Sequence, residues 1–293
     1  MKRLVVVGAA GRLGAALCRS YAADFGVVGL GRNEIDLFSE DQIRAALDPL
    51  SFDLLINCAA LTNVDYCETH AEEAHRINGD AVKTLAEICR EKSARLIHTS
   101  TDYVFDGETT KPYREDDAAN PVNVYGESKR AGEIAALGVS SENLVARVSW
   151  VFGPDRPSFV DAILKKSLET ESVEAIDDKF SAPAFTLDLA KSFRSLMLKP
   201  NEGGVMHVCN SGECSWREYG QFAIDCAVKA GLPVKARTVA GVKMSQMASF
   251  VARRPRYTVL STVRLEGVGE KPRPWQSAVQ DYVTNYFAPR SRA

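Results

Sequence analysis

The chain has 293 residues, a length that suits two modest domains or one α/β unit with an elaboration. Hydrophobic residues make up 45% of it and charged residues 25%, which is ordinary globular composition and excludes a disordered or fibrous protein. The 36 Lys and Arg are balanced by 38 Asp and Glu. The net charge of −2 therefore leaves no basic excess for binding nucleic acid or an anionic membrane surface.

The cysteines and the N-terminal residues bear on the cellular compartment. Seven cysteines are scattered along the chain without a Cys-x-x-Cys pair, which predicts reduced thiols in a cytoplasmic protein rather than a disulfide framework. The longest apolar runs are too short to cross a bilayer. Because a strand-like run follows Met1, Lys2 and Arg3 at once, no secretory or transit segment is predicted.

The first half of the chain alternates short β-branched apolar runs with segments of helical periodicity. We expect strands at residues 4–7, 27–30, 54–57, 95–99 and 144–148, and helices at 13–23, 41–47, 71–91 and 125–137. Central parallel strands are apolar throughout because both of their faces are buried. The pattern therefore predicts βαβ units in a Rossmann-type, doubly wound parallel sheet.

The second half has a looser rhythm, with helices expected at 158–169, 186–198, 215–230 and 275–287. We interpret residues 1–149 as a dinucleotide-binding domain and 150–293 as a smaller mixed α/β substrate domain at the carboxyl edge of the sheet. Some segments around 175–210 are expected to pack back on the first domain. The polar stretch 106–123 is either a functional lid or rim, or a surface excursion.

Three glycines at intervals of three, Gly8, Gly11 and Gly14, follow the first strand and open the first helix. Glycine permits a tight turn there and lets backbone N–H groups approach a pyrophosphate, to which the helix N-terminus adds partial positive charge. This strand–turn–helix context predicts a dinucleotide site that includes Arg12 and Leu13.

The residues after the second strand indicate which dinucleotide is bound. Arg32 stands where NAD enzymes often place an acid for the ribose hydroxyls, and its guanidinium suits the 2′-phosphate of NADP. Glu34 and Asp36 follow closely, and Asp36 and Leu37 are expected to border the same site. NADPH is therefore the predicted cofactor, and NADH stays open.

Tyr125 and Lys129 lie four residues apart, on one face of an expected helix. A lysine cation stabilises a phenolate and so lowers the pKa of a tyrosine toward a useful range for proton transfer. A hydroxyl at the end of the fourth strand, Thr101 or Ser100, would project from the edge of the sheet where open α/β folds bind ligands. That hydroxyl could hydrogen-bond a substrate carbonyl beside Tyr125.

Four stretches carry a more specific pattern: 57–65 (NCAALTNVD), 100–107 (STDYVFDG), 120–129 (NPVNVYGESK) and 147–153 (RVSWVFG). With the glycine turn and the Tyr-x-x-x-Lys pair, they resemble the dTDP-4-dehydrorhamnose reductase family of the extended short-chain dehydrogenase/reductase superfamily. The resemblance continues through residues 212–216 and 253–255. It implies NADPH-dependent reduction of the C4 ketone of a nucleotide-linked 4-keto-6-deoxy sugar, with dTDP-4-dehydro-L-rhamnose as the first candidate.

The resemblance also implies roles for individual residues. Tyr125 would donate a proton, Lys129 would be its partner and a ribose ligand, and Thr101 would polarise the carbonyl. The other implied contacts are Asp102 and Trp150 against the substrate, and Ala60, Leu61, Thr62 and Thr99 beside the cofactor. A homodimer is possible, and metal-bridged dimers are described within the family, but no acidic cluster here matches a Mg²⁺ site.

Residues 177–184 depart from the family pattern Asp-Asp-Gln-x-Gly-x-Pro-Thr at Lys179, Ser181 and Ala184. The added ammonium of Lys179 would favour a different diphosphate or sugar substituent, or it would point to solvent as lone lysines usually do. These departures weaken the assignment of the sugar and leave the cofactor half of the prediction unaffected.

Three other functions remain in view. A sugar-nucleotide 4,6-dehydratase would carry Glu where Tyr103 stands, whereas an epimerase needs only the same Tyr and Lys. A non-catalytic regulatory subunit, similar to the β subunit of methionine adenosyltransferase, would bind a partner protein instead.

Cys67, His70 and His75 do not share one helical face, so no metal site is predicted from them.

Overall fold

The computed structural model describes residues 1–292, and at its centre lies a six-stranded sheet. The strands are β1 (Arg3–Val7), β2 (Gly26–Leu30), β3 (Leu54–Asn57), β4 (Arg95–Thr101), β5 (Leu144–Val148) and β10 (Gly204–His207). They lie in the order β10-β5-β4-β3-β1-β2, and every neighbouring pair is parallel. The chain therefore winds outward on both sides of β1, which confirms the predicted doubly wound α/β fold.

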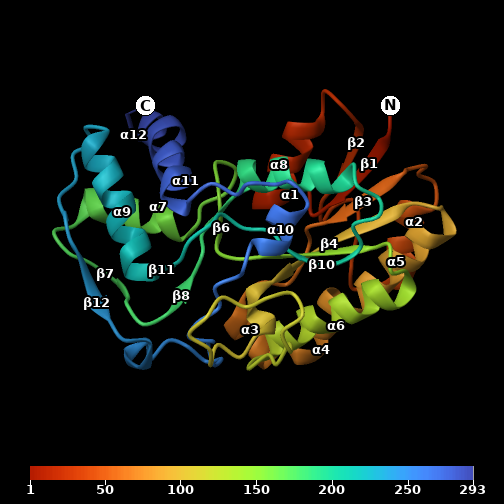
Figure 1. Ribbon diagram of the computed structural model, residues 1–293, viewed down its shortest axis with the longest axis horizontal. Helices are drawn as coiled ribbons and strands as arrows, with labels where there is room; N and C mark the ends of the chain where they lie inside the picture. Colours follow the sequence, from red (N-terminus) through yellow and green to blue (C-terminus); the bar gives the residue numbers. More distant parts are fainter. Residues whose placement is uncertain (293) are drawn as a thin grey trace.

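Alternate residues of each strand feed two hydrophobic cores, because strand side chains alternate between the faces of a sheet. Leu4 and Val6 pack with α1 (Arg12–Tyr21) and α8 (Thr186–Met197). Val5 and Val7 pack with helices of the opposite layer. These are α2 (Glu40–Leu47), α5 (Ala81–Glu91) and α6 (Val124–Val139). Figure 1 shows the sheet between these two helical layers.

The helix expected at 71–91 is present, but it contains an irregular turn. After α3 (Val64–Thr69), the structure has α4 (Ala71–His75), then a π-helical turn over Arg76–Asp80, then α5. A π-helical turn often marks a functional site, because it shifts one residue out of the regular helical rows. Here the shifted turn includes the buried Asn78.

The second half contributes short strands and helices around a core of its own, which includes Phe152, Leu164, Tyr219 and Tyr282. Its strands are β6 (Val151–Phe152), β7 (Val173–Ile176), β8 (Phe180–Ser181), β9 (Ala184–Phe185), β11 (Cys214–Ser215) and β12 (Val239–Val242). Its helices are α7 (Phe159–Glu169), α9 (Trp216–Lys229), α10 (Val263–Gly267), α11 (Trp275–Tyr282) and α12 (Ala288–Arg292). β10 and α8 belong instead to the main sheet and its helical layer.

The polar stretch 106–123 lies along the second half of the chain and is anchored there. The Tyr113 amide donates to the Val259 carbonyl at 2.8 Å, and the Ser261 amide donates to the Tyr113 carbonyl at 2.7 Å. The Tyr113 ring also stacks on Phe105, with ring centres 4.0 Å apart. These contacts anchor the stretch to the rest of the protein at Tyr113.

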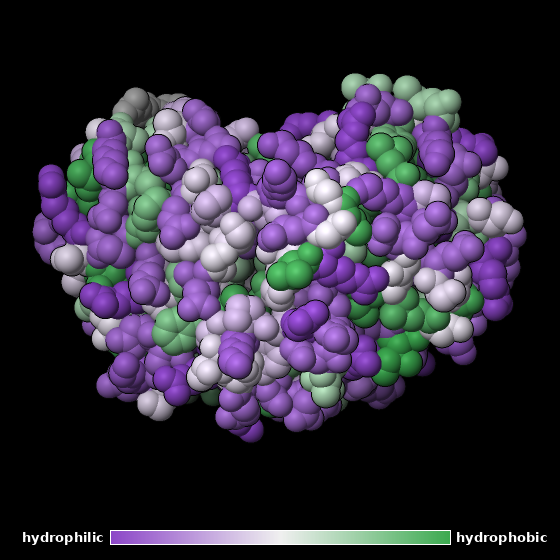
Figure 2. Space-filling model, in the orientation of Figure 1, coloured by the Kyte–Doolittle hydropathy of each residue, from purple (hydrophilic) through white to green (hydrophobic). Residues whose placement is uncertain are grey.

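Hydrophilic side chains dominate the face of the molecule shown in Figure 2, and hydrophobic ones form small, scattered groups. No helix within residues 1–292 is long and apolar enough to cross a membrane.

Candidate active site

The glycine turn lies where β1 ends, at the point from which the sheet winds in two directions. Gly8 has a φ of +82°, and its amide donates to the Leu30 carbonyl at 2.8 Å. A Cβ on Gly8 would lie 2.6 Å from the Ala59 nitrogen, and one on Gly14 would lie 2.2 Å from the Gly8 oxygen. A side chain at Gly8 would therefore push the turn away from the segment after β3, and one at Gly14 would push α1 away from the turn.

The start of α1 fits a phosphate group. Gly11 is the exposed N-cap residue, it supplies no side-chain hydrogen bond to the helix, and no acid lies in the first turn. The first N–H groups of the helix are thus left for an anion, which the helix dipole attracts. Leu13 is buried in the core, whereas Arg12 donates to the carbonyl oxygens of Arg156 and Pro157.

The turn after β2 separates one basic side chain from two acidic ones. Glu34 accepts a hydrogen bond from the Gly31 amide at 2.7 Å, and Asp36 accepts one from the Phe38 amide at 2.9 Å. Both carboxylates are thus occupied by the backbone of their own turn, while Arg32 is exposed. Leu37 is buried in the core.

The segment after β3 is held in place by Asn78, a residue that no sequence motif indicated. Asn78 Oδ1 accepts from the Leu61 amide at 2.8 Å, and its Nδ2 donates to the Leu61 carbonyl at 3.0 Å. The same Nδ2 lies 3.0 Å from Ser128 Oγ of α6. Ala60 and Leu61 are half-buried and Thr62 is exposed, so this segment lines an accessible edge of the sheet.

Tyr125 lies on the first turn of α6, which Asn123 caps by accepting from the Gly126 amide at 2.8 Å. Burial raises the pKa of the Tyr125 phenol above its ordinary value, and a hydrogen bond with Thr101 opposes the rise. The Tyr125 ring lies edge-on to Tyr103, 5.6 Å between centres. The direction differs from the lowering expected from the Tyr-x-x-x-Lys pair, because desolvation dominates.

Lys129 is buried one helical turn later. Its ammonium donates to the Thr99 carbonyl at 2.8 Å and lies 3.3 Å from His98 Nε2. Burial lowers the pKa of Lys129 to about 8, and the Glu133 carboxylate opposes this lowering. The pKa of His98 is lowered well below its ordinary value by burial and by the Lys129 charge, so His98 remains neutral.

Asp102 is 2% exposed, and hydroxyl groups surround its carboxylate. Thr101 Oγ1 donates to Oδ1 at 3.1 Å. On Oδ2, three hydroxyls converge: Ser149 at 3.0 Å and, from the second half of the chain, Ser181 at 3.1 Å and Thr258 at 2.5 Å. Asp102 therefore connects the strand end that carries Thr101 to the second half of the chain.

Lys179 lies beside this hydroxyl-lined carboxylate and is fully buried, at 0% exposure. Its ammonium donates to the Pro255 carbonyl at 2.6 Å and lies 4.7 Å from the centre of the Tyr103 ring. Burial lowers the pKa of Lys179 to about 8, and the Asp102 carboxylate opposes this lowering. The structure therefore excludes a solvent-exposed position for the Lys179 side chain.

Ser100, the alternative hydroxyl at the end of β4, has a different environment. It donates to Glu133 Oε1 at 2.6 Å, and Glu133 also accepts two hydrogen bonds of 2.7 Å from Arg147. Since all three side chains are buried, Ser100 belongs to an internal network. Thr101 is the hydroxyl that faces Tyr125.

Trp150 follows β5 with a φ of +38°, a left-handed conformation that is strained for a tryptophan. Its indole N–H is buried and has no hydrogen-bond partner within the described chain. The Trp150 ring lies 5.7 Å from Trp216 and 6.3 Å from Tyr219. A strained backbone and a donor without a partner are features expected of a ligand contact.

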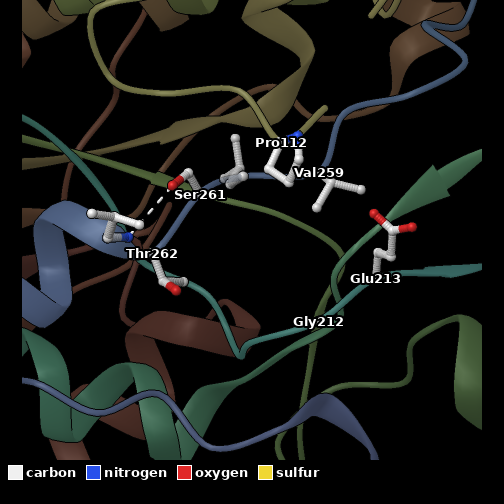
Figure 3. Close-up of a pocket in the computed structure, with 8 residues that line it drawn as sticks. Pro112, Gly212, Glu213, Val259, Ser261 and Thr262 are labelled. Carbon is white, nitrogen blue, oxygen red and sulfur yellow. Dashed lines mark hydrogen bonds between the residues drawn. The ribbon is translucent and has the colours of Figure 1, made fainter. Parts of the chain in front are cut away.

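Two cavities lie between residues 107–112 and the second half of the chain, and Tyr125 lines neither of them. One, of about 230 Å³, is lined by Pro112, Gly212, Glu213 and residues 259–263 (Figure 3). The other, of about 280 Å³, shares Glu213 and adds residues 107–110, Phe180, Arg256 and Tyr257. Neither includes a predicted catalytic residue.

The cysteine and histidine residues of α3 and α4 have other contacts. Cys67 donates to the Leu61 carbonyl at 3.5 Å, and the His70 ring stacks on Tyr66 with centres 3.8 Å apart. Within residues 1–292, no group of three or more His, Cys, Asp or Glu side chains could hold a metal ion.

The chain is similar to known proteins over nearly its whole length. The family model described as RmlD substrate binding domain matches residues 1–288. Spore coat polysaccharide biosynthesis protein SpsK of Bacillus subtilis is 34% identical over 284 residues, covering 97% of each chain. A dTDP-4-dehydrorhamnose reductase of Mycolicibacterium smegmatis is 34% identical, covering 96% of this chain and 85% of the relative.

A crystal structure of dTDP-4-dehydrorhamnose reductase from Bacillus anthracis, in complex with NADP, is similar with a TM-score of 0.89. The two sequences are 26% identical, and the match covers 98% of this chain and 99% of that chain. The resemblance inferred from the motifs is thus confirmed, and with it the expectation of a nicotinamide cofactor. The chain belongs to the RmlD family, the dTDP-4-dehydrorhamnose reductases of the extended short-chain dehydrogenase/reductase superfamily, and is an NAD(P)-dependent oxidoreductase.

Proposed function

We propose that this protein uses NADPH to reduce the C4 ketone of a nucleotide-linked 4-keto-6-deoxy sugar, with dTDP-4-dehydro-L-rhamnose as substrate and dTDP-L-rhamnose as product. The observation that carries the proposal is that the Thr101 hydroxyl lies close enough to the Tyr125 phenol to oppose the rise in its pKa, at the carboxyl end of β4. Two hydroxyl groups there can share one carbonyl oxygen, as reduction of a ketone requires.

A bound nicotinamide would supply the hydride, and the residues of the glycine turn with Arg32 would hold its dinucleotide. Tyr125 is the proton donor, because burial raises its pKa and keeps the phenol protonated at neutral pH. Thr101 donates a hydrogen bond to the carbonyl oxygen, where negative charge develops. For this, its single proton must turn from Asp102 Oδ1 toward the substrate.

Lys129 contributes positive charge beside this pair. Its ammonium donates to the Thr99 carbonyl and has a pKa of about 8, so it is mostly charged at neutral pH. A buried cation near Tyr125 favours loss of the phenolic proton as the product alcohol forms. We assign Lys129 this electrostatic role together with binding of the nicotinamide ribose.

Trp150 and Asp102 are assigned to the substrate side of the site. The unpartnered indole N–H of Trp150 is available to a sugar or phosphate oxygen. Asp102 acts less directly, because hydroxyls occupy both of its oxygens. We assign it the role of setting where the Thr101 proton lies.

The test is a substrate panel followed by loss of NADPH absorbance. We expect turnover with dTDP-4-dehydro-L-rhamnose, and slower turnover with the UDP and GDP analogues and with the C5 epimer. Reduction of none of these ketones, together with co-purification of a partner protein, would favour a regulatory subunit instead.

A further inference from the structure

Residues 155–157, which connect β6 to α7, lie against the glycine turn of the first half of the chain. Arg156 Nε donates to the Ala10 carbonyl at 3.0 Å. In the opposite direction, Arg12 Nε donates to the Arg156 carbonyl at 3.1 Å, and a second Arg12 nitrogen donates to the Pro157 carbonyl. Each half of the chain thus places one arginine on the backbone of the other.

This contact is fixed on both sides of Arg156. Asp155 pairs with Arg19 of α1, whose Nη2 lies 3.0 Å from Asp155 Oδ2. After Pro157, Ser158 caps α7, since its amide and hydroxyl lie 2.7 and 2.8 Å from Asp161 Oδ2. The backbone around Arg156 is therefore held between α1 and α7.

Positive charge is available at the glycine turn, from the start of α1 and from the exposed guanidinium of Arg156. α1 has no acid in its first turn and no side-chain cap at Gly11. Within the described chain, no carboxylate lies within ion-pair distance of Arg156. Its Nε is used on Ala10, which leaves both terminal nitrogens of an exposed guanidinium for another acceptor.

We propose that Arg156, a residue of the second half of the chain, binds a phosphate of the nicotinamide dinucleotide. The inference rests on the proposed function, because it requires a dinucleotide on the glycine turn. The planar fork of a guanidinium suits two oxygens of one phosphate, and the contact to Ala10 holds it there before the dinucleotide arrives. Both the pyrophosphate and the 2′-phosphate of NADPH offer this chemistry.

A consequence is that the cofactor joins the two halves of the chain. α7 follows Arg156 directly, and its Asp161 accepts a hydrogen bond from Tyr282 in the core of the second half. A phosphate bound by Arg156 and by the first turn of α1 would therefore strengthen the contact between the two cores. NADPH should raise the melting temperature of the wild type more than that of a variant without this guanidinium.

The test measures dissociation constants of NADPH and NADH by fluorescence titration of the cofactor-free protein, for wild type, Arg156→Ala and Arg156→Lys. Arg217→Ala is the matched control, because Arg217 is also exposed and its Nε also donates to a backbone carbonyl, that of Val239 at 3.0 Å, far from the glycine turn. Melting without cofactor shows whether each variant is folded.

Arg156→Ala should raise the dissociation constant of the cofactor by about tenfold, the loss expected for one charge-assisted contact. The ratio of the dissociation constants of variant and wild type should be smaller at high salt, because salt screens the contact. Equal losses for NADPH and NADH would place the contact at the pyrophosphate, and a loss for NADPH alone would place it at the 2′-phosphate. Arg156→Lys should lose less affinity for the cofactor, and Arg217→Ala should bind it as tightly as the wild type.

Wild-type affinity in Arg156→Ala would overturn the inference and leave the proposed function standing. A wild-type protein that binds neither cofactor would overturn both.

Discussion

Ser181 Oγ lies 3.1 Å from Asp102 Oδ2, and this contact joins the second half of the chain to the strand end that carries Thr101. Thr101 has one hydroxyl proton, which it donates to Asp102 in the structure but needs for the substrate carbonyl during reduction. Each further donor on Asp102 weakens the demand of the carboxylate for that proton. When Ser181 donates its one proton to Asp102 rather than to the Thr258 carbonyl at 3.2 Å, it favours the reactive orientation of Thr101.

Removing the Ser181 hydroxyl should lower kcat. We expect about a tenfold loss in Ser181→Ala, equivalent to ~1.4 kcal/mol in the transition state, with little change in KM. Ser181→Gly should lose less, because it leaves room for a water molecule to donate in place of the hydroxyl.

The control for Ser181→Ala is Ser167→Ala, which removes another fully buried hydroxyl that donates within α7. If Ser181 acts through Thr101, the loss should largely disappear when Thr101 is already Val, and steady-state kinetics of the double-mutant cycle would reveal this. The same loss in both backgrounds would contradict that path.

Tyr125→Phe should abolish most of the turnover and leave cofactor binding intact. The phenol is the proposed proton donor, and a positioned acid contributes roughly 10²–10⁴-fold to such a step. Stopped-flow measurement of NADPH oxidation, with the dissociation constant of NADPH measured separately, separates the two effects. A variant with wild-type kcat would exclude Tyr125 from the reaction.

The parts of this site that depend on residues close together in the sequence could be predicted. The glycine turn, Tyr125 and Thr101 are recognisable because a turn and a helix impose fixed spacings. The hydroxyls on Asp102 could not be found this way, since Ser149, Ser181 and Thr258 meet only through folding.

The burial of single polar side chains also could not be predicted from the sequence. A lone lysine is normally exposed, yet Lys179 is buried because Pro255, Tyr103 and Asp102 surround its ammonium. Asn78 gave no signal because its role depends on the π-helical turn that places it under Leu61. The parallel α/β fold was predictable because apolar runs and helices alternate along the chain.

Arg32→Ala should weaken NADPH more than NADH. The two acids of the same turn are occupied by backbone amides, so the exposed guanidinium is the group left for a 2′-phosphate. We expect about a tenfold rise in the NADPH dissociation constant and less than twofold for NADH. Titrations of both cofactors at one ionic strength test this, and equal changes would place the 2′-phosphate elsewhere.

Lys179→Met should change how stability depends on pH. Burial lowers the pKa of Lys179 from 10.5 to about 8. Below that pH the side chain is protonated in both the folded and the unfolded chain. Between pH 8 and about 10 the unfolded chain binds a proton that the folded chain has released, so this lysine adds stability as the pH rises.

The free energy of unfolding of the wild type should therefore gain on that of Lys179→Met from pH 8 to 10, by at most ~1.4 kcal/mol per pH unit. Taking the difference between the two proteins cancels the thiols and phenols that titrate in the same range. Urea unfolding at each pH measures it, with Lys165→Met, whose side chain is 74% exposed, as the control. A difference that stays constant with pH would mean that Lys179 keeps its proton in the folded protein, held by Asp102 more strongly than burial opposes it.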